Sequence, residues 1–292
     1  MRKSYPLFFI LACCILSSLN SCKTHEVTIP SYLYIKPVSM VITKPAQGQP
    51  AIMVNDVWIF DNGLVRGDFA TGTTIPIQRS GKTTIVASAG IKYSGNGEQR
   101  TIYQMFNPYS KDIDLKPNQV DTLEPIFSYV DNAQFPLVED FDGNGFAFEY
   151  RPDTKQNGDT ILKDNGSEAW SPGKFSGKVQ LKSGVANSYL EIWSKVFNNF
   201  PRAHPFYLEI DYKCNIPFVV GFYETSGSGT IHTPVYVLKE KSEWNKLYFD
   251  LASEINSKPP GTQFRFFIGF SNSNGTANPY VWLDNIKLIY LD

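Results

Sequence analysis

The sequence predicts an all-β protein made of two β-sandwich domains, a small one followed by a larger one. Short apolar runs separated by glycine, proline, asparagine and aspartate fill most of the chain, and helical periodicity is nearly absent. Hydrophobic residues make up 42% and aromatic residues 14% of the 292 residues, which is enough for packed cores. The length suggests two domains, although one large β domain would also fit it.

The first 21 residues have the properties of a cleaved secretory signal. Arg2 and Lys3 give a basic start, and residues 7–16 (LFFILACCIL) form an uncharged apolar run. That run is too short to cross ~30 Å of hydrocarbon as a helix. Residues 19–22 (Leu-Asn-Ser-Cys) then resemble the lipobox of bacterial lipoproteins. The alternative is an ordinary cleaved signal followed by a chance cysteine.

The lipobox resemblance implies that Cys22 is the lipidated residue. In that family the thiol takes a diacylglycerol, the chain is cut before the cysteine, and the new amine is often acylated. Several acyl chains are needed because one alone attaches only marginally. Residues 22–26 are then the lipidated cysteine and a polar tether. No later segment approaches ~18 uninterrupted apolar residues, so the predicted membrane attachment is through lipid alone.

The same N-terminal region suggests a subcellular location. Lys23 directly after the acceptor, with abundant Asn, Tyr and Phe in the chain, is similar to lipoproteins of the Bacteroidetes type. That resemblance implies an outer membrane lipoprotein, on the periplasmic or the cell-surface face.

Charge and cysteine content exclude some functions. Without Arg2 and Lys3, 25 of the 27 basic residues remain against 28 acidic ones, a net charge near −3. This balance gives no electrostatic case for binding nucleic acid. Once the signal is removed and Cys22 is lipidated, Cys214 is the remaining cysteine. Its alternation with apolar neighbours predicts a buried structural thiol.

The first block, residues 27–130, contains several predicted strands around an Asp-Asn-Gly hairpin turn at residues 61–63. The strands are predicted at residues 51–60, 64–69, 73–78, 83–87 and 100–106. The turn spacing over about residues 54–90 resembles PEGA-type and related immunoglobulin-like modules, which implies a spacer or docking module. A polar stretch with a proline at residues 131–137 predicts a linker.

The second block, residues 138–292, alternates with period two. In residues 189–196 and 206–214 the even positions are mostly apolar, and the odd positions are polar or aromatic. This predicts sheets with one buried and one wetter face. Further strands are predicted at residues 218–223, 235–238, 244–251, 264–270 and 281–291, with a helical turn at 251–255. Trp282, in phase with Ile286 and Leu288, is predicted to lie in the core.

Three segments of this block resemble the jelly-roll sandwiches of carbohydrate-binding modules, including galactose-binding-like folds. They are residues 139–142 (Glu-Asp-Phe-Asp), 244–251 and 281–288. The resemblance implies that the opening and closing strands lie side by side, where acidic residues often hold a structural calcium ion. The matching candidates are Glu139, Asp140, Asp142 and Asp284. The alternative is that these acids face water and bind nothing.

The candidate ligand-binding residues follow from what sugars require. A flat aromatic ring packs against the apolar face of a pyranose, and polar groups around it bind the hydroxyls. Trp193 has this setting, since Tyr189, Glu191 and Lys195 share its face of the strand. Tyr223 on a nearby strand and Trp170 on a polar loop are further candidates. The alternative for Trp193 is burial, because tryptophans are usually substantially buried.

Catalysis is not predicted. A nucleophile–base pair normally needs a histidine, and the chain offers His25, His204 and His232 in a tether, a turn and beside a Gly-Ser-rich loop. A pair of carboxylates about 5–9 Å apart across a cleft would instead favour a hydrolase function. The sequence therefore favours a lipoprotein that binds glycan without catalysis. The alternative is an adaptor or assembly lipoprotein that docks another envelope protein.

Overall fold

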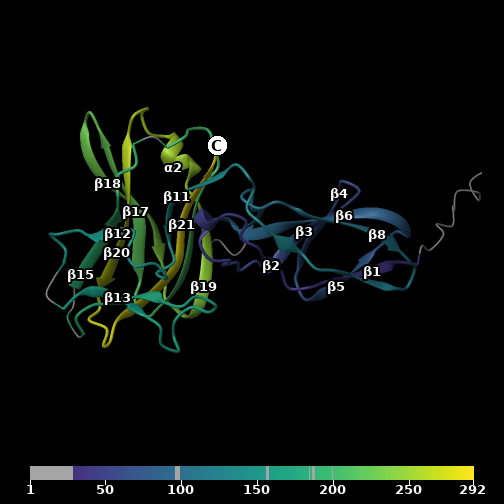
Figure 1. The fold of residues 1–292 in the computed structure, drawn as a ribbon, viewed down its shortest axis with the longest axis horizontal. Coiled ribbons are helices and arrows are strands. Elements are labelled where there is room, and N and C mark those ends of the chain that lie inside the picture. The colour runs from purple at the N-terminus through teal and green to yellow at the C-terminus, as the bar shows by residue number, and fades with distance from the viewer. Residues whose placement is uncertain (1–28, 96–98, 156–157, 184, 186–187, 199) are drawn as a thin grey trace, which may run out of the picture.

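A computed structural model describes residues 29–95, 99–155, 158–183, 185, 188–198 and 200–292. The predicted signal, Cys22 and the tether lie outside these ranges. The described chain is almost entirely β and forms two lobes side by side (Figure 1), which confirms the predicted all-β architecture. Within the described residues, no helix is both long and apolar enough to cross a bilayer.

The N-terminal domain is a small sandwich of two sheets. One sheet has the order β5 (Thr73–Ile77), β1 (Ser31–Ile35), β9 (Val120–Leu123). The other contains β4 (Leu64–Ala70), β3 (Asp56–Asp61), β6 (Gly81–Lys92), β7 (Arg100–Ile102) and β8 (Tyr109–Leu115). The remaining elements are β2 (Ser39–Met40), β10 (Ile126–Phe127), and the 3₁₀ turns η1 (Pro45–Gln47) and η2 (Tyr93–Gly95).

The hairpin turn predicted in this domain is present. Asn62 and Gly63 have φ of +47° and +79°, and they join β3 to β4. Two consecutive positive φ values are what a tight two-residue hairpin requires, and glycine and asparagine tolerate them best. The predicted strand at residues 51–60 is shorter, since β3 begins at Asp56.

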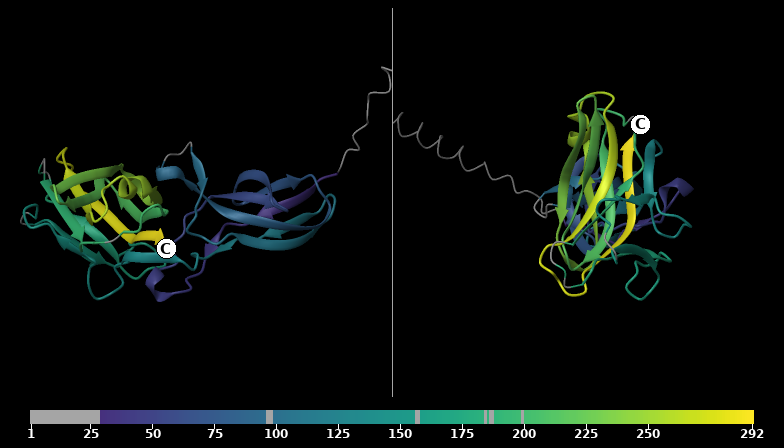
Figure 2. Two further views of the ribbon diagram at one scale, coloured as in Figure 1. Left: turned by 90° about the horizontal axis from the view of Figure 1, so that it is seen from above. Right: turned by 90° about the vertical axis from the view of Figure 1, so that its left-hand side faces the viewer.

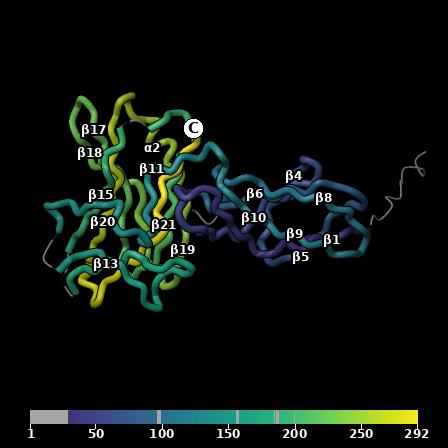
Figure 3. Tube along the Cα trace, in the orientation of Figure 1, coloured from purple at the N-terminus to yellow at the C-terminus, as the bar shows by residue number. Residues whose placement is uncertain are grey.

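The predicted linker at residues 131–137 is mostly a strand. β11 (Ala133–Glu139) pairs with β21 (Tyr280–Leu291), and the tube in Figure 3 follows the chain from the N-terminal lobe into this pair. Pro136 lies where the register shifts between Gln134 and Leu137, at a bulge. A proline is tolerated there because no regular ladder bond is needed.

The C-terminal domain is a larger sandwich whose sheets we call proximal and distal. The proximal sheet has the order β13 (Thr160–Asp164), β14 (Ser176–Gln180), β21, β16 (Phe206–Cys214), β19 (Lys241–Asp250), with β11 also on β21. The distal sheet has the order β12 (Phe148–Tyr150), β15 (Ser188–Ser194), β20 (Gln263–Asn272), β17 (Phe218–Ser226), β18 (Gly229–Leu238). The helix α2 (Ala252–Asn256) follows β19, as predicted.

The domain core lies between these two sheets. On β15 the even positions Leu190 and Ile192 are buried, as predicted, but the strand ends at Ser194 and Val196 is 42% exposed. Cys214 is buried, and burial raises its pKa to about 11, so the thiol is unreactive at neutral pH.

The outer face of the proximal sheet is not wet, contrary to the prediction for residues 206–214. The N-terminal domain covers it, and Tyr207, Tyr248 and Ile289 belong to a core shared with that domain. Glu209 is fully buried there and accepts hydrogen bonds from the hydroxyls of Tyr103 and Tyr129.

The distal sheet faces the other way. It lies on the side of the C-terminal domain away from the N-terminal lobe, while β1 lies toward the opposite end of the molecule (Figure 1). Viewed from that end, the green and yellow strands of the C-terminal domain lie in front of the N-terminal domain (Figure 2, right). The outer face of the distal sheet is therefore the large sheet face of this domain left open by the domain arrangement.

Candidate functional site

A buried carboxylate lies at the centre of the outer face of the distal sheet. Glu191 on β15 is fully buried, although its side chain is on the outer side of the sheet. It accepts hydrogen bonds from the hydroxyls of Tyr189 and Tyr223, the latter at 2.6 Å. A guanidinium nitrogen of Arg151 and the Nε2 atom of His232 each lie 3.4 Å from a carboxylate oxygen of Glu191. These four side chains shield Glu191 from solvent, and its hydrogen bonds hold the rings of Tyr189 and Tyr223 in place.

The two tyrosines remain proton donors across the physiological pH range. Burial, followed by the hydrogen bond to Glu191, raises the pKa of both Tyr189 and Tyr223 well above the ordinary value of 10.0. A carboxylate that accepts two phenol protons holds the rings in one orientation, so the face is preorganised rather than mobile.

An aromatic layer around Glu191 extends over four strands, β15, β20, β17 and β18. Trp193 meets Tyr223 edge to face at a centroid distance of 5.6 Å, and Tyr223 stacks on His232 at 4.6 Å. The His232 ring centroid in turn lies 4.3 Å from the centroid of the Phe267 ring. Gly269 makes room for this layer, since a Cβ there would lie 2.5 Å from the Tyr189 hydroxyl oxygen.

A pocket of about 270 Å³ opens beside Trp193 and Tyr223. Its polar walls come from β17, β18 and β20, and its lining residues are Trp193, Val196, Tyr223, Thr225, Thr230, Gln263, Phe264 and Arg265. The Arg265 guanidinium carbon lies 4.3 Å from the centroid of the Trp193 ring. The Trp193 indole nitrogen is buried and has no hydrogen-bond acceptor in the described chain. The pocket thus combines flat aromatic surface with hydroxyl, amide and guanidinium groups.

The structure brings together four of the six predicted ligand-binding residues. Tyr189, Glu191, Trp193 and Tyr223 form this face. Lys195 follows the end of β15, is exposed, and has its ammonium 5.8 Å from the Phe197 ring.

Trp170, the sixth candidate, is elsewhere. Its backbone N–H donates to Ser176 at 2.8 Å, beside the proximal sheet. Trp170 therefore belongs to the other side of the sandwich and does not join Trp193.

Arg151, His232, Gln263 and Arg265 were not predicted for the site. Arg265 had a usable signal, since it alternates with Phe264 and Phe266 in a predicted strand. Its pairing with Tyr223 places it on the outer face. The sequence held no such signal for Arg151 and His232. Arg151 reaches Glu191 from a turn, and His232 reaches it from β18, the hairpin partner of β17.

The four acidic residues predicted to bind calcium do not form a ligand set. Asp142 accepts backbone N–H groups of Lys174 and Phe175, both at 2.9 Å, and Glu139 accepts those of Phe141 and Ala147.

Asp284 and Asp140 are engaged as well. Asp284 accepts the Ser176 hydroxyl at 2.6 Å, and Asp140 accepts the Asp142 N–H at 3.2 Å. Among the described residues, no three acidic, histidine or cysteine side chains gather as metal ligands. Each of the four carboxylates therefore already accepts an N–H or O–H group in the structure.

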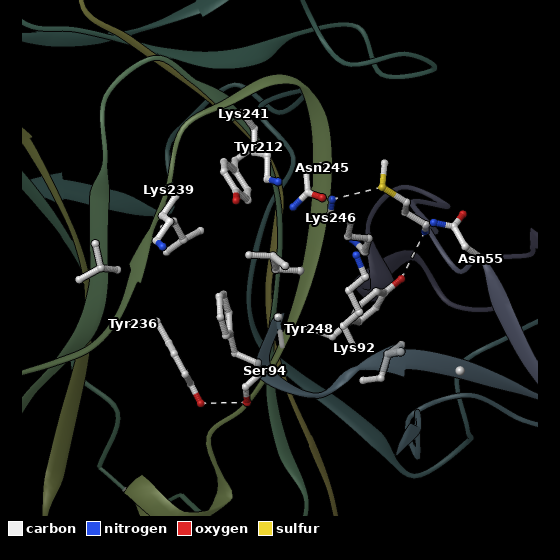
Figure 4. A pocket seen from close by; sticks show the side chains of 18 of the residues that line it. Asn55, Lys92, Ser94, Tyr212, Tyr236, Lys239, Lys241, Asn245, Lys246 and Tyr248 are labelled. Carbon is white, nitrogen blue, oxygen red and sulfur yellow. Dashed lines mark hydrogen bonds between the residues drawn. The ribbon is translucent and has the colours of Figure 1, made fainter. Parts of the chain in front are cut away.

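A second pocket, of about 380 Å³, lies at the junction of the two domains (Figure 4). Lys92, Lys239 and Lys241 surround it, and Tyr236 bonds to Ser94 across it at 3.0 Å. The Tyr236 ring is stacked on Phe249 at 4.2 Å.

The groups that line the distal pocket include aromatic, hydroxyl, amide and guanidinium groups. Its described lining contains no carboxylate, whereas a glycosidase places two beside the scissile bond. Glu191 lies behind the tyrosines, with its oxygens already bonded to both hydroxyls.

Comparison with known proteins gives structural similarity only. No protein-family model and no curated protein matches the chain. A xylan-binding domain from Paenibacillus barcinonensis is 14% identical with a TM-score of 0.38, covering 56% of this chain and 98% of that one. The family 11 carbohydrate-binding module of a Clostridium thermocellum cellulosomal cellulase is 16% identical with a TM-score of 0.35, covering 53% and 94%.

The enzymatically active domain of bacteriophage CBA120 tailspike protein 4 is 9% identical with a TM-score of 0.35, covering 54% of this chain. The match spans 19% of the tailspike chain, about a fifth of its length. Similarities of this size assign no ligand to the present chain.

Proposed function

We propose that this protein is a membrane-anchored lipoprotein that binds glycan through the outer face of the distal sheet and catalyses no reaction. The observation that carries the proposal is the pocket beside Trp193 and Tyr223. Sugar binding requires an apolar platform next to several hydrogen-bonding groups in a preformed concavity, and the pocket supplies both. Thr225, Thr230 and Gln263 provide the hydroxyl and amide groups.

The rigidity of the face supports the same function. Glu191 is bonded to both Tyr189 and Tyr223, so the platform needs little reordering when a ligand arrives. Preorganisation lowers the entropic cost of binding.

The domain arrangement supports a tethered binding protein. The described chain begins beside β1, and the distal face lies at the other end of the molecule (Figure 1). With lipid on Cys22, this arrangement would hold the pocket away from the membrane, with the N-terminal domain as spacer. We place the protein in the outer membrane, on the periplasmic or cell-surface face.

The test is a glycan array screened with residues 23–292, which retain both sandwiches. Trp193→Ala should weaken binding at least tenfold, about 1.4 kcal/mol. Trp244→Ala is the matched control, because Trp244 is a partly buried tryptophan on β19 of the other sheet. It should leave the affinity within about twofold.

Two results would count against the proposal. A folded chain that binds no glycan would favour the adaptor function, to be followed by capture of an envelope protein. Binding that Trp193→Ala leaves unchanged would exclude the distal pocket as the site.

A further inference from the structure

Arg265 has no ion-pair or hydrogen-bond partner among the described residues. Each of the other described arginines has acceptors: Arg66 and Arg79 bond Asp61, Arg100 bonds Asp56, Arg151 bonds Asp153, and Arg202 bonds backbone carbonyls. Arg265 has neither an ion pair nor a hydrogen bond there, and its Nε is buried without an acceptor. A buried guanidinium N–H without an acceptor is costly, so this arginine is incomplete as it stands.

The position of Arg265 directs it to a ligand. Its guanidinium lies 4.3 Å from the Trp193 ring centroid, and both side chains line the distal pocket. A cation–π contact with the indole holds the guanidinium beside the pocket, and its N–H groups can still donate to a ligand. The arginine is therefore fixed where a sugar on the Trp193–Tyr223 platform would meet it.

The surroundings contain little to compete for this charge. The described lining of the pocket has no aspartate or glutamate. Glu149, which pairs with Trp193 in register on β12, is exposed and forms no ion pair with Arg265. Glu191 is covered by Tyr189 and Tyr223, whose hydroxyls it already binds.

We propose that the distal pocket selects anionic sugars, with Arg265 binding the carboxylate of a uronic acid or a sulfate ester while Trp193 and Tyr223 carry the ring. This inference rests on the proposed glycan-binding function and names its ligand class. Two guanidinium N–H groups can donate at once to two oxygens of a carboxylate or of a sulfate ester. Neutral sugars would leave the Arg265 charge without a counterion.

Two matched pairs of polysaccharide test this selectivity with residues 23–292. Polygalacturonate is compared with highly methyl-esterified pectin, in which the carboxylates are neutralised, and dextran sulfate is compared with dextran. Isothermal titration should give at least tenfold tighter binding to an anionic member than to its neutral partner. The first pair reports a carboxylate, and the second reports a sulfate.

The residue is tested by Arg265→Ala and Arg265→Gln, with Lys239→Ala as control. Lys239 is an exposed cation at the junction pocket, so its loss changes the net charge by the same amount. Both Arg265 variants should lose at least tenfold affinity for the anionic polysaccharide, and Lys239→Ala should stay within twofold. In the unmodified protein, raising sodium chloride should weaken anionic binding, because salt screens the pair.

The possible failures are distinguishable. Equal or tighter binding of the neutral members would overturn the selectivity while leaving glycan binding intact. A loss with Lys239→Ala and not with the Arg265 variants would move the site to the domain junction. A folded chain that binds none of the four polysaccharides, and nothing on the glycan array, would remove the proposed function itself.

Discussion

The two outer faces of the C-terminal sandwich have similar sequences and opposite roles. On β15 the outward positions are Tyr189, Glu191 and Trp193, and on β16 they include Tyr207 and Glu209. Both faces bury a glutamate that accepts two tyrosine hydroxyls. The proximal tyrosines come from the other domain, whereas the distal ones come from the same sheet.

The difference lies in how completely the charges are matched. On the proximal face Lys246 lies 3.1 Å from Glu209 and 3.3 Å from Asp211. Lys287 donates to the Gln49 carbonyl at 2.9 Å. On the distal face Arg265 has no such partner among the described residues. The proximal face thus contains an ion-paired network around Lys246, whereas the distal face contains an arginine with no ion pair among the described residues, and the proposed ligand contact rests on that difference.

The largest expected effect comes from breaking the proximal network with Glu209→Ala. Removing this carboxylate leaves the Lys246 ammonium paired only with Asp211, and leaves the Tyr103 and Tyr129 hydroxyls without an acceptor. Loss of one partner of a buried pair costs about 3–5 kcal/mol of unfolding free energy. Urea denaturation of the variant would measure this loss.

The control for that variant is Glu149→Ala on the distal face, which removes an exposed glutamate. It should change the unfolding free energy by less than about 0.5 kcal/mol. If both variants lost a similar amount of unfolding free energy, the buried network around Glu209 would not stabilise the protein more than an exposed glutamate does.

On β15 and β16, sequence patterning identified which side of the strand each residue occupies, but it did not identify what covers that side. The alternation of residues 206–214 was read correctly as two faces, and the prediction that one was wet was wrong. Tyr103 and Tyr129, which cover Glu209, come from 80 or more residues earlier. Contacts at that separation leave no trace in local periodicity.

Bulges were a second source of error. Trp282 is buried as predicted, with 4% of its surface exposed, but it does not share the inward face of Ile286 and Leu288: it lies opposite Lys178 on the outer side of the proximal sheet. The register of β21 against β16 shifts between Glu209 and Asp211, which changes the phase between the two halves of the strand. Period-two counting fails across an extra residue, whereas it held on β15, where Trp193 was placed correctly.

The proximal face should also give stability an unusual dependence on pH. Burial raises the pKa of Asp284 from 3.8 to about 8 and lowers that of Lys287 from 10.5 to about 8. Between pH 4 and 8 the folded state holds the Asp284 proton that the unfolded state has lost, so stability falls as pH rises. Between pH 8 and 10.5 the folded state has lost the Lys287 proton, so stability rises again.

The midpoint of thermal unfolding should therefore pass through a minimum near pH 8. Asp284→Asn should flatten the falling limb between pH 4 and 8, because the amide does not titrate. Asp140→Asn, which changes a partly exposed acid near the same strand pair, should leave that limb in place. A falling limb that persists in Asp284→Asn would assign the effect to another group.

The smallest expected effect is that of calcium. Asp142 and Glu139 accept backbone N–H groups, and a bound cation would require those hydrogen bonds to be given up. Millimolar calcium or a chelator should therefore shift the unfolding midpoint by less than about 1 °C, and glycan affinity should not change. A stabilisation by several degrees, lost in Asp142→Asn, would mean that binding rearranges these acids into an ion site. In that case the two sites would differ in how they form. The distal face is preorganised by its own tyrosines, whereas the acidic residues at the edge of the proximal sheet would take up their final arrangement only when a metal ion binds.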